Sequence, residues 1–199
     1  MEKYLWKIDE KKLNETNLQK YSDFISKNYK VDANRDFNKI WKWSVKNKSA
    51  FWKSIWEFTE VKGKLGDVII KESDIFFKNK FFPDSKLNYA ENLLRKNNND
   101  VAIIFKSENG YKNNLSWKDL NSNVAKISNW MKDNGIKKND RVAAYLPNIP
   151  ETVIAYISAA ALGAIWSSCS PDFGTNGVID RFSQISPKIL FIGDKYFYN

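Results

Sequence analysis

The fold is decided by residues 141–193, which read RVAAYLPNIPETVIAYISAAALGAIWSSCSPDFGTNGVIDRFSQISPKILFIG. The apolar run at 142–146 is typical of a strand buried on both faces, and 164–169 and 188–193 are expected to be the next two strands. Helical segments at 151–162 and 176–186 separate these runs, and Glu151 stands at the positive end of the first helix dipole. Strands and helices that alternate at this spacing imply right-handed parallel crossovers. The sequence therefore predicts an α/β fold with a parallel sheet.

Upstream of this stretch the pattern predicts a hairpin. The run Val101–Phe105 is typical of a strand, Asn109 and Gly110 form a turn dipeptide, and Tyr111–Leu115 is the expected partner strand.

A long amphipathic helix is expected after the hairpin. Ser116 and Asp119 have the spacing of a capping box. Gly135 is placed to end the helix in the left-handed conformation. Apolar side chains recur at steps of three and four, as a helix face requires; they are Trp117, Leu120, Val124, Ile127 and Met131.

The first 95 residues are aromatic and rich in lysine. Two short amphipathic helices are expected within 37–45 and 51–58, with Ser49 as a cap for the second, and a further short helix within 86–94. Tryptophans cluster in this region, at Trp41, Trp43, Trp52 and Trp56. They could form a base-stacking platform, but packing against a neighbouring domain is the favoured interpretation. We expect an extension over residues 1–95 and a second domain over 96–199.

Composition excludes several kinds of chemistry. The 199 residues contain no His and one Cys, Cys169. Without imidazole there is no Ser-His or Cys-His catalysis and no His-ligated metal. A single thiol closes no internal disulfide and builds no Cys-based zinc site. Cys169 itself, at the end of an apolar run, is expected to be a small buried residue.

The net charge of +9 invites a nucleic-acid interpretation. The basic residues are nearly all lysines and are scattered along the chain, whereas a phosphate-binding face concentrates them in a stripe. We therefore expect a small-molecule substrate and no nucleic acid. The longest apolar run, 152–166, is shorter than the ~20 residues of a spanning helix, and residues 1–6 do not resemble a secretory signal. No membrane partner and a cytoplasmic location are expected.

Loops at the carboxyl ends of the strands are the expected ligand site, because ligands of open parallel sheets bind there. Two loops qualify, at 147–150 and 170–174, and neither is a glycine-rich phosphate loop. The pair Asp140–Arg141 is expected to be a solvated structural turn. The residues alone thus predict part of an α/β domain with no catalytic set and no metal site.

Longer motifs resemble the adenylate-forming acyl-CoA synthetases. The motifs are 115–120 (LSWKDL), 135–151 (GIKKNDRVAAYLPNIPE) and 160–166 (AALGAIW). Upstream, Trp43-Ser44, Phe51-Trp52, 81–83 (FFP) and 87–92 (LNYAEN) resemble the N-terminal extension of acetyl- and acetoacetyl-CoA synthetases. The run 166–174 (WSSCSPDFG), with 180–184 (DRFSQ) and 187–191 (PKILF), is similar to the acetoacetyl-specific group in particular.

The resemblance implies an acid–thiol ligase that converts acetoacetate, ATP and CoA into acetoacetyl-CoA with Mg²⁺, through an acyl-adenylate. It also implies that the fold is the start of the large N-terminal domain, with parallel βαβ units after a short helical extension. The phosphate loop, the acyl pocket and the adenylation lysine of such enzymes lie downstream of what is present. The chain is therefore expected to be an N-terminal fragment, inactive alone, whose partner is the remainder of the enzyme after Asn199.

One binding role is carried over from the resemblance. The turn formed by Ser170, Pro171, Asp172, Phe173 and Gly174 is expected to border the nucleotide of CoA. Acetyl-specific relatives have Gly-Gly where this chain has Pro171-Asp172, so one donor is lost and a negative charge is gained. The alternatives are an acetyl- or propionyl-CoA synthetase fragment, or a non-catalytic basic binding module on the same scaffold.

Overall fold

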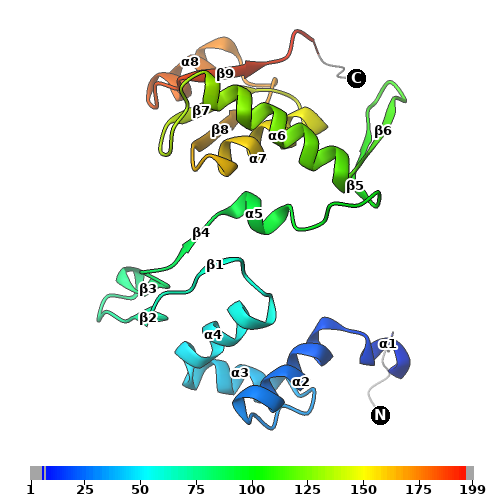
Figure 1. Ribbon diagram of the computed structural model, residues 1–199, viewed down its shortest axis with the longest axis vertical. Helices are drawn as coiled ribbons and strands as arrows, with labels where there is room; N and C mark the ends of the chain where they lie inside the picture. The colour runs from blue at the N-terminus through cyan, green and yellow to red at the C-terminus, as the bar shows by residue number, and fades with distance from the viewer. Residues whose placement is uncertain (1–5, 7, 196–199) are drawn as a thin grey trace. The chain divides into compact units, whose positions relative to one another are not determined.

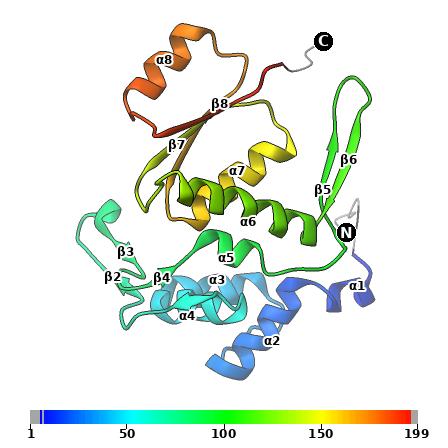
Figure 2. The ribbon, with the colours of Figure 1, turned by 45° about the horizontal axis from the view of Figure 1, so that its top comes forward.

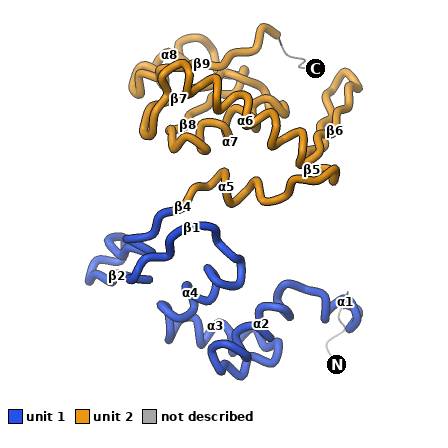
Figure 3. Tube along the Cα trace, viewed as in Figure 1, with its two compact units in different colours: residues 1–86 blue, residues 87–199 orange. Residues whose placement is uncertain are grey.

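A computed structural model describes residues 6 and 8–195. These residues form two compact units that divide between Lys86 and Leu87 (Figures 1 and 3). Among them no helix combines the length and the apolar character that a membrane crossing requires.

The first unit begins with helices. They are α1 (Glu10–Asn14), α2 (Asn17–Tyr29), α3 (Phe37–Lys46) and α4 (Lys48–Phe58). Very short elements follow: β1 (Gly63–Lys64), β2 (Ile70–Lys71), the 3-10 turn η1 (Phe76–Lys78), β3 (Lys80–Phe81) and β4 (Lys86–Leu87). Strands β2 and β3 pair antiparallel.

The core of the first unit lies among its helices. Its buried members are Tyr21, Ile25, Ala33 and Ile40. The hydroxyl of Tyr21 is 2.7 Å from Oγ of Ser54, so this buried polar group is hydrogen-bonded. The two amphipathic helices expected here are confirmed as α3 and α4. Ser49 as a cap is wrong, because α4 already begins at Lys48 and has no side-chain cap.

The tryptophans of the first unit make no single platform. Trp43 packs edge-on against Phe51, Trp52 against Phe81, and the Trp56 ring is 5.3 Å from that of Phe82. Trp41 is exposed. The rings of Trp43, Trp52 and Trp56 therefore contribute to packing within their own unit.

The second unit contains every longer strand of the described chain. Its elements before the sheet are α5 (Tyr89–Leu93), the hairpin strands β5 (Val101–Lys106) and β6 (Lys112–Ser116), and α6 (Trp117–Asp133). The sheet and its crossovers are β7 (Arg141–Tyr145), α7 (Pro150–Ala161), β8 (Ile165–Cys169), α8 (Thr175–Ser183) and β9 (Ile189–Ile192).

The sheet has the order β8-β7-β9, and both pairings are parallel. Its two faces carry different cores, and α8 lies on the opposite side of the sheet from α6 and α7 (Figure 2). On one face Val142 packs with Met131 of α6 and Ala159 of α7. On the other, Ala143 packs with Phe182 of α8. The predicted α/β fold with a parallel sheet is confirmed.

Local signals around α6 are confirmed as well. The Ser116 hydroxyl accepts from the Asp119 amide, and the Asp119 carboxylate accepts from the Ser116 amide, which completes the capping box. The Ser116 hydroxyl also donates to the Asp119 carboxylate at 2.6 Å, and this bond, followed by the one from the Ser116 amide, lowers the pKa of the Asp119 carboxyl. Gly135 has φ +81°, the left-handed conformation that favours glycine.

Helix α5 packs with the second unit. Ala90 is buried in one core with Ile154 and Ile157 of α7. The side-chain Nδ2 of Asn88 donates to the carbonyls of Ala160 and Ala161 at 3.0 and 3.1 Å. These contacts place the division between compact units before α5, whereas the sequence pattern predicts a division after residue 95.

Candidate functional site

The carboxyl ends of the three parallel strands meet at one edge of the sheet. The segments that follow β7, β8 and β9 border two adjoining pockets there, of about 570 and 340 Å³. Pro147, Pro171 and Lys195 belong to both. Carboxyl edges of this kind are where open parallel sheets bind ligands. We call the larger cavity the strand-end pocket.

The strand-end pocket has walls from distant parts of the second unit. Its lining consists of residues 105–109, Tyr111, residues 147–149, residues 170–172 and Lys195. The two loops expected from the sequence, 147–150 and 170–174, thus contribute to one cavity. The tip of the β5–β6 hairpin forms the third wall, which sequence reasoning missed.

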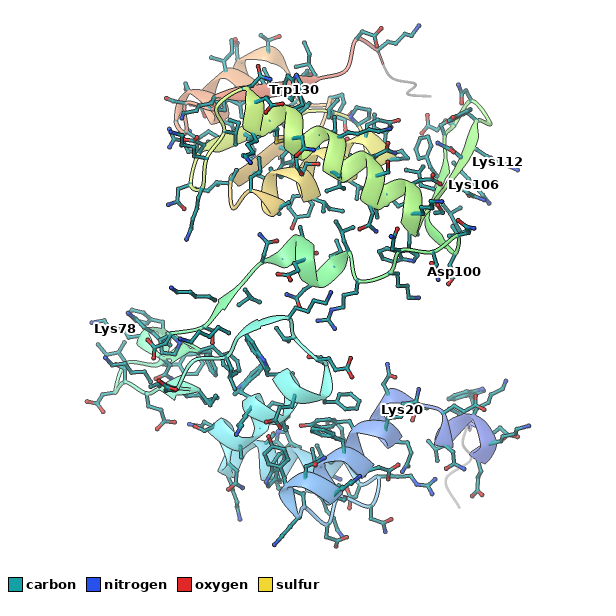
Figure 4. The ribbon with its side chains drawn as sticks, viewed as in Figure 1. Lys20, Lys78, Asp100, Lys106, Lys112 and Trp130 are labelled. Atoms are coloured by element: carbon teal, nitrogen blue, oxygen red, sulfur yellow. The ribbon has the colours of Figure 1, made fainter. Side chains whose placement is uncertain are left out.

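Charge in the strand-end pocket is mixed. Lys106 and Lys195 supply cations, and Glu108 and Asp172 supply anions. Lys106 lies on the β5–β6 hairpin, as does Lys112 (Figure 4). Lysines in the lining of a pocket can bind phosphate as point charges. The negative charge of Asp172 is expected to repel an anionic ligand. Two lysines line the same pocket and supply positive charge beside it.

The segment 170–174, here the SPDFG loop, forms a tight turn. The Phe173 amide donates to the Ser170 carbonyl at 3.1 Å, and the Ser170 hydroxyl donates to the Asp172 carboxylate at 2.8 Å. Pro171 suits the second position of such a turn because its ring fixes φ. The turn brings Ser170, Pro171 and Asp172 into the pocket wall.

Further contacts hold the SPDFG loop against the sheet and α8. The Tyr145 hydroxyl, at the end of β7, is 2.8 Å from the Pro171 carbonyl oxygen and 2.9 Å from that of Phe173. The Arg181 guanidinium lies 4.3 Å from the centroid of the Phe173 ring, a cation–π distance. Gly174 then caps α8 without a side-chain hydrogen bond.

Asp140 and Arg141 brace the opposite, amino-terminal edge of the sheet. Asp140 pairs with Lys188 at 2.8 Å and accepts from the Lys137 amide. Both interactions lower the pKa of the Asp140 carboxyl, and the hydrogen bond from Lys188 has the larger effect. Arg141 Nε donates to the Ile185 carbonyl at 2.7 Å. The expected structural role is confirmed, but the Asp140 side chain is only 15% exposed and is not a solvated turn residue.

The described residues hold no group of three or more potential His, Cys, Asp or Glu metal ligands. Cys169 is buried, 5% exposed, on the α8 face of the sheet, as its apolar surroundings predicted. The arrangement can therefore receive a polar ligand through backbone donors and lysines, but it contains no nucleophile–base pair in the part of the chain that is described.

Comparison with known proteins decides the family. The family model described as "AMP-binding enzyme" matches residues 90–198, more than half of the chain. The chain belongs to the AMP-binding enzyme family. The match begins within α5 and includes the hairpin, the parallel sheet and the strand-end pocket.

Individual relatives carry a more specific name. The chain is 38% identical to acetoacetyl-coenzyme A synthetase of Rhizobium meliloti (strain 1021), over all of this chain and 30% of that protein. It is 37% identical to acetoacetyl-CoA synthetase of Xenopus tropicalis, over 99% of this chain and 30% of the relative. The chain thus spans about a third or less of the relatives that it matches.

A solved structure agrees with these relatives. Acetoacetyl-CoA synthetase from Streptomyces lividans matches 98% of this chain and 31% of its own, with a TM-score of 0.88 and 30% sequence identity. The described elements therefore have the fold of the N-terminal part of an adenylate-forming member of the AMP-binding enzyme family.

Tyr145 and Lys195 are functional candidates that the sequence analysis did not name. The place of both at the carboxyl edge can be read from the sequence, because Tyr145 is the last residue but one of the run 142–146 and Lys195 follows the run 188–193, whereas the contacts of Tyr145 cannot. The sequence holds no signal for the position of the β5–β6 hairpin beside the strand-end loops. Contacts between segments so far apart in the chain leave no periodic pattern in the sequence.

Proposed function

We propose that the chain is the N-terminal part of an ATP-dependent acid–thiol ligase that makes acetoacetyl-CoA from acetoacetate and CoA. The carrying observation is the likeness to acetoacetyl-CoA synthetases along the whole chain, in sequence and in fold. The remaining part of the ligase, beyond Asn199, is its required partner, and the proposed location is the cytoplasm.

The proposed reaction has two balanced steps. The acetoacetate carboxylate attacks the α-phosphorus of ATP, which forms acetoacetyl-adenylate and releases pyrophosphate. The sulfur of CoA then attacks the acyl carbon, its thiol proton is lost, and AMP leaves. Mg²⁺ would neutralise phosphate charge in the first step. The described residues hold no group of three or more His, Cys, Asp or Glu side chains, and no ligand of this ion is assigned among them.

Within this ligase, residues 1–95 are proposed to be the N-terminal extension and residues 96–199 the first part of the adenylation domain. The adenylation domain would use the parallel sheet as scaffold. The SPDFG loop, comprising Ser170, Pro171, Asp172, Phe173 and Gly174, is proposed to border the nucleotide of CoA. Support comes from its place at the carboxyl edge, beside a pocket whose lining includes Lys106 and Lys195. Lysine cations suit the phosphates of that nucleotide.

Product identification tests the proposal. The complete coding sequence that contains this chain should be expressed and incubated with ATP, Mg²⁺, CoA and acetoacetate. We expect acetoacetyl-CoA, AMP and pyrophosphate in equal amounts, measured by mass spectrometry and ion-exchange chromatography. Formation of ADP and phosphate, or no thioester at all, would refute the proposal.

A further inference from the structure

The end of β7 carries a tyrosine whose position is fixed by the sheet. Tyr145 pairs in register with Cys169 of β8 and Ile192 of β9. Its ring packs against the core formed by Ala143, Cys169 and Phe182. The hydroxyl is therefore presented from the central strand of the sheet, whereas the SPDFG loop that it contacts would otherwise be held by its own turn and by the contact of Phe173 with Arg181.

One hydroxyl bridges two carbonyls of the SPDFG loop. Tyr145 Oη lies 2.8 Å from the oxygen of Pro171 and 2.9 Å from that of Phe173. A phenol has one proton to donate, so the two carbonyls share it. Both peptide planes are thereby oriented with their oxygens toward Tyr145.

Orientation of the Phe173 carbonyl also orients the next amide. The described chain has no cis peptide bond, so the Gly174 N–H points opposite to the Phe173 carbonyl, away from the Tyr145 hydroxyl. No described residue accepts a hydrogen bond from this N–H. The Tyr145 hydroxyl thus fixes Pro171 in the pocket wall and turns the Gly174 N–H away from itself.

We infer that Tyr145 is a positioning residue for CoA, which holds the SPDFG loop with its Gly174 amide free to donate to the ligand. The inference rests on the proposed function, in which this loop borders the CoA nucleotide. Tyr145 acts through the loop and not on the reacting atoms. Its removal should therefore weaken the use of CoA and leave the formation of the acyl-adenylate unchanged.

The test is Tyr145→Phe in the complete enzyme, because this change keeps the packed ring and deletes only the hydroxyl. We expect the KM for CoA to rise about five- to tenfold, the effect of one lost hydrogen bond on the loop. The kcat should stay within about twofold, as should acetoacetate-dependent ATP–pyrophosphate exchange without CoA. Tyr21→Phe is the matched control, since it deletes a phenol hydroxyl bonded to Ser54 in the first unit.

A second readout needs no substrate. Hydrogen exchange of a peptide spanning the SPDFG loop should be about five- to tenfold faster in Tyr145→Phe and unchanged in Tyr21→Phe. Unchanged exchange, or an unchanged KM for CoA in an active enzyme, overturns the inference. If the unmodified enzyme makes no CoA thioester, it is the proposed function that fails, and the exchange measurement still decides whether Tyr145 holds the loop.

Discussion

At the scale of single residues, polar side chains fix the ends of the strands. Tyr145 reaches from β7 to the SPDFG loop at the carboxyl edge, and Arg141 and Asp140 reach to the segment before β9 at the opposite edge. These contacts do not depend on charged groups elsewhere in the molecule. Each is a hydrogen bond or ion pair between residues that the parallel crossovers bring together.

Asp140 provides a pH-dependent test of this bracing. Because hydrogen bonding to Lys188 and to the Lys137 amide lowers its pKa below 3.8, the carboxylate stabilises the folded state above that value. The stabilisation should disappear as pH falls through the lowered folded-state pKa. Asp140→Asn should therefore lower the urea midpoint of the chain at pH 7, and the difference from the unmodified chain should shrink below about pH 4.

Asp133→Asn is the control for Asp140, since Asp133 is exposed at the end of α6. It should change stability by less than about 0.5 kcal/mol. An Asp140→Asn effect that persists unchanged in acid would contradict the ion-pair explanation.

At the scale of elements, helices α6 and α7 pack closely through small side chains. Ser158 is fully buried on α7, and its hydroxyl lies 2.7 Å from the Ile154 carbonyl oxygen and 3.2 Å from that of Val124 on α6. Ala155 and Ala159 beside it are also buried. The face of α7 that meets α6 therefore has no room for a larger residue.

Ser158→Leu should consequently destabilise the second unit. Overpacking of a dense interface costs about 1–3 kcal/mol, which urea denaturation followed by circular dichroism would measure. Ala161→Leu, at an exposed position of the same helix, should have little effect. Equal stability of the two variants would show that the helices are not closely packed at Ser158.

The elements that the sequence predicted share a strong local signal. Helix α6 has both a capping box and a periodic apolar face, and the strands of the parallel sheet are short, mainly apolar segments separated by helical ones. Helix α2 was missed, although Thr16 caps it, because its buried residues Tyr21 and Ile25 stand among polar ones. Strands β1 to β4 have two residues each, too short for any alternation to show.

Only part of the candidate site could be predicted from the sequence, and the reason is physical. The rule for parallel sheets locates loops at the carboxyl edge from strand order alone, so the loops at 147–150 and 170–174 could be named. The hairpin wall around Lys106 depends on how β5 and β6 lie relative to the sheet, which side-chain packing decides. Tyr145 lies in an apolar run and shows its polar role only through its contacts.

At the scale of the whole molecule, an apolar surface of the parallel sheet remains uncovered among the described residues. On β9, Leu190 and Ile192 are 48% and 66% exposed, while Ile189 and Phe191 pack on the face covered by α6 and α7. Helix α8 covers Ala143 and Cys169 on the same face as Leu190 and stops short of β9. Exposed apolar strand surface of this kind promotes association.

The isolated 199-residue chain should therefore self-associate at high concentration. The double variant Leu190→Lys/Ile192→Lys should reduce this association about severalfold in light scattering, because it replaces the exposed apolar surface. Asn129→Lys/Asn134→Lys adds the same charge at exposed positions of α6 and its end. If both double variants reduce association equally, net charge and not the β9 surface is responsible.

The substrate preference of the complete enzyme tests the central claim most directly. The measurement is kcat/KM for acetoacetate against acetate and propionate, with ATP, Mg²⁺ and saturating CoA, in an assay coupled to pyrophosphate. The account predicts a preference of at least about tenfold for acetoacetate, because a site that hydrogen-bonds the extra carbonyl rejects acids that lack it. An enzyme that prefers acetate or propionate, or that activates none of the three acids, would contradict it.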